Sequence, residues 1–152
     1  MTGKAGLDLA VLVDAFAAFP AQFAVAARAA DGRPVPAGEW GPADVAAHLL
    51  AVEAEVWQAR FGQLAAGESP HWAWTEPGRA PGFDGVPIDA VLAAFASARA
   101  TTVALVGGLD AAAWARSGTH VTYGVLDVAG LLRVAADHDS EHLLSLAADR
   151  PG

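Results

Sequence analysis

Two histidines near the C-terminus, His138 and His142, have the spacing of a pair of metal ligands. They are four positions apart in a segment with helical periodicity, so their side chains share one face of the helix. The Cβ atoms of such a pair are about 5–6 Å apart, close enough for two imidazoles to bind one ion. Two ligands do not complete a site, so a third must come from another segment.

His48 is the candidate third ligand. In its own helical segment it shares a predicted face with Val45 and Glu55. If the two helices face each other, His48 points toward His138 and His142. Three neutral imidazoles with an open fourth position are typical of a catalytic or ligand-binding divalent metal site. Imidazole suits Zn, Ni, Cu or Fe, of which we expect Zn or Ni.

The histidine pair has two other interpretations. The stretch also satisfies H-x-x-E-H, the zinc motif of inverzincin proteases, with Glu141 as the base. That motif needs a third ligand from a larger catalytic domain, and residues 143–152 contain no glutamate, so we reject a protease. The histidines could instead be hydrogen-bonded core residues, with Asp137 or Asp139 as partners. Spacing alone leaves this alternative open.

Glu55 and His120 are the candidate catalytic residues. Glu55 lies two predicted turns from His48 and could accept a hydrogen bond or a proton, although an ion pair is the alternative. His120 lies in the connector before the last helix and could approach the open face of the metal site. The alternative for His120 is a solvated loop residue.

Segments with helical periodicity must position these side chains. Pro42 and Asp44 mark the start of the second helix, and Asp110 is a predicted N-cap. Residues 67–87 are rich in Gly and Pro, which indicates a long crossover. We therefore predict an all-α fold, a four-helix bundle in a single domain spanning residues 1–152. The predicted helices cover residues 7–30, 42–66, 88–106 and 126–148, and no strand pattern is convincing.

Composition excludes several classes of protein. The chain has 54% hydrophobic and 17% charged residues, which excludes intrinsic disorder. Its net charge of −8 repels phosphate backbones, so we expect no nucleic-acid partner. We also expect no membrane span and, because Asp8 and Asp14 interrupt the first apolar segment, a cytoplasmic location. There is no cysteine, so any thiol chemistry must come from a bound small molecule.

Two blocks of sequence resemble the DinB-like superfamily. Residues 39–50, which include Trp40, Pro42 and His48, are similar to the start of that family's second helix. Residues 118–143 are similar to its glycine-containing lead-in and to the H-x-x-x-H of its last helix. The order and spacing of these blocks extend the resemblance over nearly the whole chain. One departure is Ser145, where the family often has glutamine.

The resemblance implies a bundle with long crossovers, a divalent ion held by His48, His138 and His142, and a homodimer. The superfamily takes in thiol-dependent S-transferases and mycothiol-dependent maleylpyruvate isomerases. It therefore implies a small-molecule substrate and a low-molecular-weight thiol such as bacillithiol or mycothiol. His138 stands where the isomerase branch has a carboxylate, which favours the all-histidine branch. The hypotheses are a metal-dependent thiol transferase, a non-enzymatic metal-binding or stress-associated bundle, and a helical dimer with core histidines.

Overall fold

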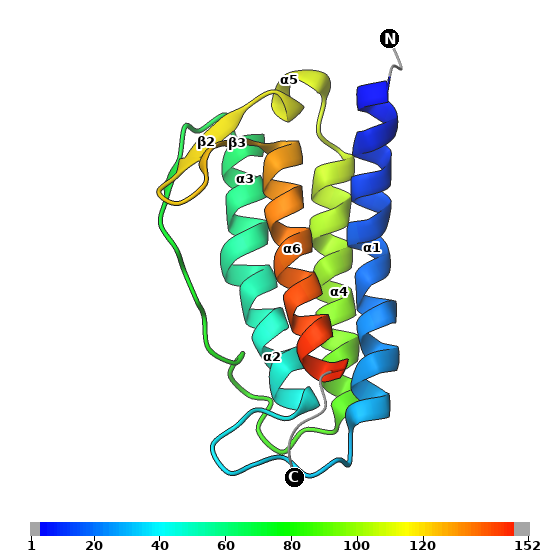
Figure 1. The fold of residues 1–152 in the computed structure, drawn as a ribbon. Coiled ribbons are helices and arrows are strands. Elements are labelled where there is room, and N and C mark those ends of the chain that lie inside the picture. The colour runs from blue at the N-terminus through cyan, green and yellow to red at the C-terminus, as the bar shows by residue number, and fades with distance from the viewer. Residues whose placement is uncertain (1–3, 148–152) are drawn as a thin grey trace.

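Four long helical rods packed side by side make up most of the molecule (Figure 1). The computed structural model describes the backbone of residues 4–147 and the side chains of residues 8–146. The prediction of an all-α four-helix bundle is confirmed. The rods are α1 (Lys4–Ala30), the continuous run of α2 (Pro42–Val52), η1 (Glu53–Gln58) and α3 (Ala59–Ala65), then α4 (Ile88–Gly107) and α6 (Val128–Ala147).

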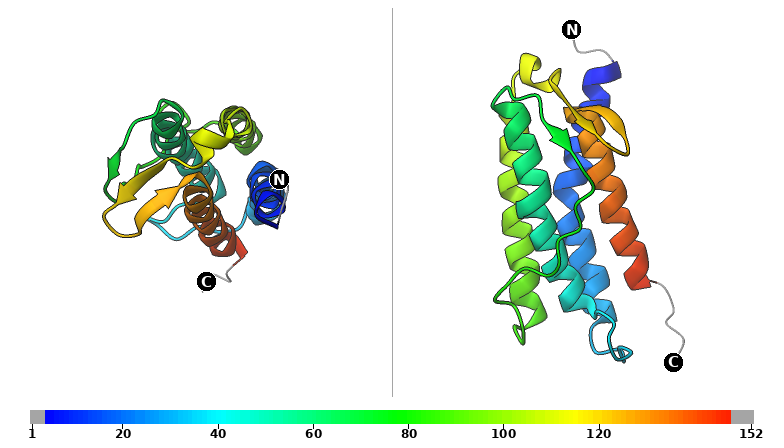
Figure 2. Two further views of the ribbon diagram at one scale, coloured as in Figure 1. Left: turned by 90° about the horizontal axis from the view of Figure 1, so that it is seen from above. Right: turned by 90° about the vertical axis from the view of Figure 1, so that its left-hand side faces the viewer.

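The direction of the helices explains the long crossover. The α2–α3 rod and α4 run the same way, so the chain must return along the whole bundle between them (Figures 1 and 2). Residues 66–87 make this return on the outside of the bundle, beside α2 and α3. Because it spans the bundle lengthwise, this segment can bring side chains to the middle of helices that are distant in sequence.

A small sheet covers one end of the bundle, which the sequence did not predict. Its strands are β1 (His71–Trp72), β2 (Ser117–His120) and β3 (Gly124–Asp127). Strand β2 pairs in parallel with β1 and antiparallel with β3. The predicted last helix therefore begins at Val128 and not at residue 126, because residues 126 and 127 belong to β3. Each strand is only two to four residues long, too short for a reliable sequence signal.

Local signals at the helix starts behave as predicted. Gly41 precedes α2, its amide donates to Asp44 Oδ2 at 3.0 Å, and Pro42 opens the helix. The side chain of Asp110 accepts the amide of Ala113 at 2.8 Å and caps α5 (Ala111–Trp114). These contacts satisfy amides that have no partner within the helix.

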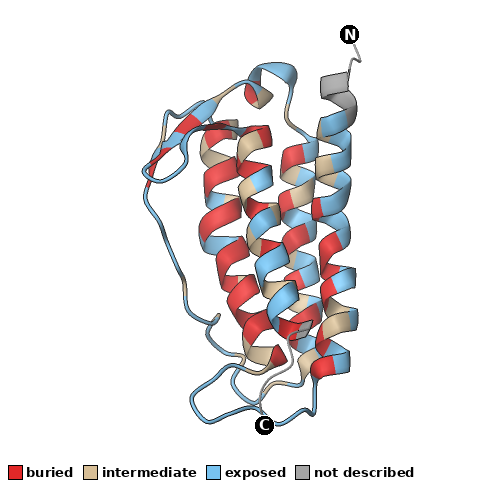
Figure 3. Cartoon of the chain, in the orientation of Figure 1, coloured by how far each residue is buried: buried red, intermediate tan, exposed pale blue. Residues whose placement is uncertain are grey.

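The core lies between the rods, as the inward buried faces and outward exposed faces show (Figure 3). One apolar cluster surrounds Phe61 and Leu131 near the sheet, and a second surrounds Phe23 and Phe95 near the other end. Between them the bundle interior is polar. His48 and Arg99 are both 1% exposed there, which is unusual for such side chains unless they have partners.

Two helices are long and apolar enough to cross a membrane by length and composition alone. They are residues 8–30 of α1 and the whole of α4. In the structure α1 packs against α4 and α6, and α4 also packs against α2. Core helices pass the same test, so this is weak evidence for a span, and the absence of a membrane partner stays a prediction.

Candidate metal centre

His138 and His142 lie one turn apart on α6 with their rings close together. Their Nε2 atoms are 3.3 Å apart and their ring centroids 4.5 Å apart. The pKa of each ring is lowered to about 4: burial is the largest cause for both, with His142, His48 and Arg99 adding to it for His138 and His48 adding to it for His142. Both imidazoles are therefore neutral at pH 7, which is the form that binds metal.

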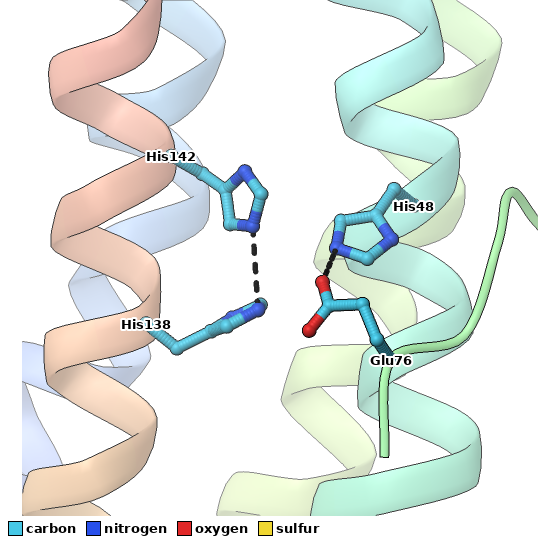
Figure 4. A group of neighbouring side chains, drawn as sticks. All are labelled: His48, Glu76, His138 and His142. Carbon is cyan, nitrogen blue, oxygen red and sulfur yellow. Dashed lines mark hydrogen bonds and ion pairs between the residues drawn. The ribbon is translucent and has the colours of Figure 1, made fainter. Parts of the chain in front are cut away.

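His48 faces this pair from α2. Its ring centroid is 4.8 Å from that of His142 and 5.8 Å from that of His138. Trp40 packs beside it, with ring centroids 5.1 Å apart. The two facing helices bring the three histidines together, and their role as metal ligands stays a prediction. Figure 4 shows their rings pointing toward one another across the gap between α2 and α6.

Glu76 completes the group from the crossover, and the sequence analysis missed it. Its Oε1 atom lies 3.3 Å from Nε2 of His48. One ligand atom from each of Glu76, His48, His138 and His142 lies within 4.8 Å of the others, so the four residues could hold a metal ion. Glu76 is on the extended crossover, where helical periodicity gives no signal. Only the unusual length of that connection hinted at a functional role.

The hydrogen bonds of His48 show why a cation fits here. Its Nδ1 lies 3.3 Å from the carbonyl oxygen of Gly78, which can only accept, so Nδ1 carries the proton. In a neutral ring Nε2 then bears a lone pair, and this buried atom has no hydrogen-bond partner. It faces the carboxylate of Glu76, another acceptor. Two facing acceptors repel each other unless a cation or a shared proton lies between them.

The spacing of the donor atoms suits a small divalent ion. Ligand atoms about 2.0–2.1 Å from a tetrahedral ion lie roughly 3.3–3.4 Å from one another. The His138–His142 distance and the His48–Glu76 distance are both 3.3 Å. The other separations reach up to 4.8 Å, so a bound ion would draw the two pairs together. The residues present therefore fit a divalent metal.

The structure does not bring Glu55 to this group. Its side chain is exposed, because the helix between His48 and Glu55 is not regular. A π-helical segment, η1, begins at Glu53, and its i→i+5 bonds take one more residue into the turn. In a regular α-helix the residue seven positions after His48 would return to the inward face. Here the inward residue is Val56, eight positions after His48. We assign Glu55 no role in the proposed function.

The π-helical segment keeps one series of residues on the buried face. Buried residues recur every four positions at His48, Val52, Val56, Arg60 and Leu64. In a regular α-helix a four-residue repeat drifts about 40° at each step, because one turn takes 3.6 residues. An inserted residue cancels most of that drift.

His120 lies beside the site, and its catalytic role stays a prediction. It is 2% exposed on β2 and lines a pocket together with His138 and Glu76. Its Nδ1 accepts the amide of Thr122 at 3.0 Å, so in the neutral ring Nε2 carries the proton. Burial, and then the charge of Arg60, lower its pKa. His120 is thus arranged as a hydrogen-bond donor.

A buried ionic network fixes α6 next to the histidine pair. Arg99 of α4 donates to both carboxylate oxygens of Asp139 at 2.9 and 3.0 Å, and to Glu53 Oε1 at 2.9 Å. It also donates to the carbonyl oxygen of Phe16 at 2.8 Å. Asp139 follows His138 directly, so this network anchors the turn that carries the histidines. Arg99 therefore has a structural role.

The comparison with protein families agrees with this arrangement. The family model described as DinB superfamily matches residues 10–146 of the chain. The chain belongs to the DinB superfamily. Among curated proteins, no sequence matches it. The DinB match covers the crossover and all but the outer ends of the four rods, and so includes all three histidines and Glu76.

Proposed function

We propose that this DinB protein is a metal-dependent transferase that uses a low-molecular-weight thiol. The observation that supports it is the convergence of three histidines and one exposed carboxylate at the edge of a pocket. The histidines come from two rigid helices, whereas Glu76 comes from an extended segment and its side chain is 49% exposed. The site thus has three fixed donors and one accessible side.

The chemistry of a transferase follows from these groups. A divalent ion, Zn or Ni by our expectation, lowers the pKa of a thiol beside it when bound. The thiol must be external, because the chain has no cysteine; bacillithiol and mycothiol are the expected candidates. The thiol proton passes to the carboxylate of Glu76. The sulfur forms a bond to the electrophilic atom of the substrate, and the leaving group departs with the electron pair of the broken bond.

A specific observation favours a second candidate function. Glu76 also stands where a fourth protein ligand would close the coordination of the ion. A closed site suits a non-enzymatic metal-binding or stress-associated bundle. The two candidates assign different roles to Glu76: a proton acceptor in the transferase and a ligand in the binding protein.

Elemental analysis of the purified protein, followed by turnover assays, tests the proposal. The assays use bacillithiol, mycothiol or 2-mercaptoethanol with several electrophiles. We expect stoichiometric metal and thiol-dependent turnover, both lost in His138→Ala and both retained in the matched control His71→Ala, which changes an exposed histidine outside the group. Protein without metal, and without uptake of Zn or Ni, would contradict both candidates.

Glu76→Gln separates the two candidates. The amide keeps the size of the side chain but is a poor proton acceptor and a weaker ligand. If the transferase is correct, turnover falls about 100-fold or more, as for loss of a general base, while metal stays bound. The binding protein would instead be supported by two results together: Glu76→Gln loses its metal, and the wild type shows no turnover. A homodimer, a cytoplasmic location and the absence of nucleic-acid partners stay predictions.

A further inference from the structure

Arg60 is a buried cation with no acidic partner among the described side chains. It is 8% exposed and lines the pocket beside His138. The described ion pairs of arginine involve Arg28, Arg79 and Arg99, and none includes Arg60. Burial lowers its pKa, with no neighbouring acid to raise it. Because a buried charge is costly without a partner, this one calls for an explanation.

The guanidinium of Arg60 is held in place by neutral groups. Its Nη2 donates to the carbonyl oxygen of Ala73 at 2.9 Å, and its Cζ lies 5.5 Å from the centroid of the Trp72 ring. Trp72 is itself fixed by a 2.8 Å bond from its Nε1 to Gln63 and by close packing on Gly118. These contacts fix the orientation of Arg60 and leave Nη1 and Nε without a protein acceptor among the described residues.

His120 adds a second donor to the same end of the pocket. Its Nδ1 is occupied by the Thr122 amide, so its Nε2–H is the free donor. Arg60 is near enough to lower the pKa of His120 through its charge. A charged guanidinium beside a neutral imidazole N–H is a suitable receptor for a carboxylate, whose two oxygens accept several hydrogen bonds.

The other side chains that line the pocket limit which further chemical groups the ligand can have. Apolar side chains, Val52, Val56 and Trp57 among them, form the wall between Arg60 and the metal centre. Asp137 and Glu141 lie at the end near His138. An apolar body suits that wall, whereas the two acids would repel a second anionic group at the metal end.

We propose that Arg60 and His120 bind the carboxylate of the small-molecule substrate, whose apolar body lies along Trp57 and whose reactive end reaches the metal centre. This assignment rests on the proposed function only for the reaction of the substrate at the metal centre. The carboxylate site itself consists of residues outside the histidine group, so binding can be measured apart from turnover.

The test compares two probes of the same shape, 3-phenylpropanoate and its neutral amide 3-phenylpropanamide, by calorimetry and tryptophan fluorescence. The metal-loaded wild type should bind the acid at least about tenfold more tightly than the amide, as expected for a charge-assisted pair. Arg60→Gln should remove that preference, and His120→Gln should reduce it. Arg116→Gln is the matched control, because Arg116 also donates to backbone carbonyls but lies outside this pocket.

Several results would overturn the assignment. Equal binding of acid and amide by the wild type does so without any variant, which covers the case in which Arg60→Gln does not fold. Inorganic phosphate binding as tightly as 3-phenylpropanoate would also contradict it, because phosphate has no apolar body. If turnover is absent but Arg60→Gln still abolishes the preference for the acid, the transferase proposal fails while the carboxylate site stands.

Discussion

Nε2 of His48 lies 3.3 Å from Oε1 of Glu76, although one residue is on a helix and the other on the crossover outside it. Gly78, two residues further along the crossover, accepts from the other ring nitrogen of His48. The crossover therefore sets the tautomer of His48 and also supplies the acid that faces its lone pair. A ligand is oriented in this way by a partner on its other nitrogen at many metal sites.

Removal of one helix-borne histidine should abolish tight metal binding. Loss of a group that only orients a ligand costs about 10–100-fold in affinity, so we expect His48→Ala to weaken Zn affinity about 100-fold or more. Competition titration with a chromophoric chelator measures this. Glu55→Gln, which changes an exposed acid, should leave the affinity within about twofold. A comparable loss in Glu55→Gln would restore the role suggested by the sequence.

The metal-free protein should lose stability as the pH falls from about 6.5 to about 4. His138 and His142 have folded pKa values of about 4, below the ordinary 6.5. The unfolded chain therefore binds protons first, and stability that is present above pH 6.5 declines down to the folded pKa. Thermal melts of metal-free wild type and of the double variant His138→Gln, His142→Gln measure the effect.

The decisive quantity is the difference between the wild type and the double variant in how far Tm falls with pH. Burial raises the pKa of Glu53 and Asp139, and these acids titrate in both proteins, so their contribution largely cancels. We expect the Tm of the wild type to fall by several degrees more than that of the variant across this window. Parallel Tm curves would show that the two histidines titrate at the ordinary pKa in the folded protein as well.

Breaking the ionic network at Arg99 should destabilise the fold strongly. Arg99→Met leaves Glu53 and Asp139 buried without their cation, a change that typically costs about 3–5 kcal/mol. Urea denaturation measures it. The exposed pair of Arg28 and Asp89 is the control, and Arg28→Gln should cost less than about 1 kcal/mol. If Arg99→Met were as mild as Arg28→Gln, the network would not anchor α6.

Gly118 should not tolerate even a methyl group. A Cβ there would lie 2.6 Å from the Trp72 ring, and Trp72 supports the guanidinium of Arg60. Gly118→Ala should cost about 1–3 kcal/mol through overpacking and weaken binding of 3-phenylpropanoate. Gly62→Ala is the matched control, since nothing lies within 4 Å of its added Cβ, and alanine in a helix is expected to stabilise by up to about 1 kcal/mol. Equal effects of both changes on stability would contradict the packing argument.

Local rules made the four rods and three of the four candidate ligands predictable from sequence. The i, i+4 spacing of His138 and His142 fixes their relation through helix geometry alone, and Pro42 and Asp110 mark helix starts by their own backbone chemistry. The π-helical turn is not predictable from a 3.6-residue period, and it carries Val56 to the inward face in place of Glu55.

The positions of Glu76 and Arg60 were decided only by tertiary structure. Glu76 reaches His48 because the α2–α3 rod and α4 run in the same direction, so the chain between them must return along the bundle. The returning segment is extended and has no helical periodicity, so the sequence does not indicate which of its side chains point inward. Arg60 looks like one more helical arginine until the pocket, Trp72 and the absence of an acidic partner among the described residues are known. The sequence by itself determined the relation of His138 to His142 through local geometry, whereas contacts between distant segments decided how His48 and Glu76 meet that pair and where the pocket lies, because they depend on how the rods pack.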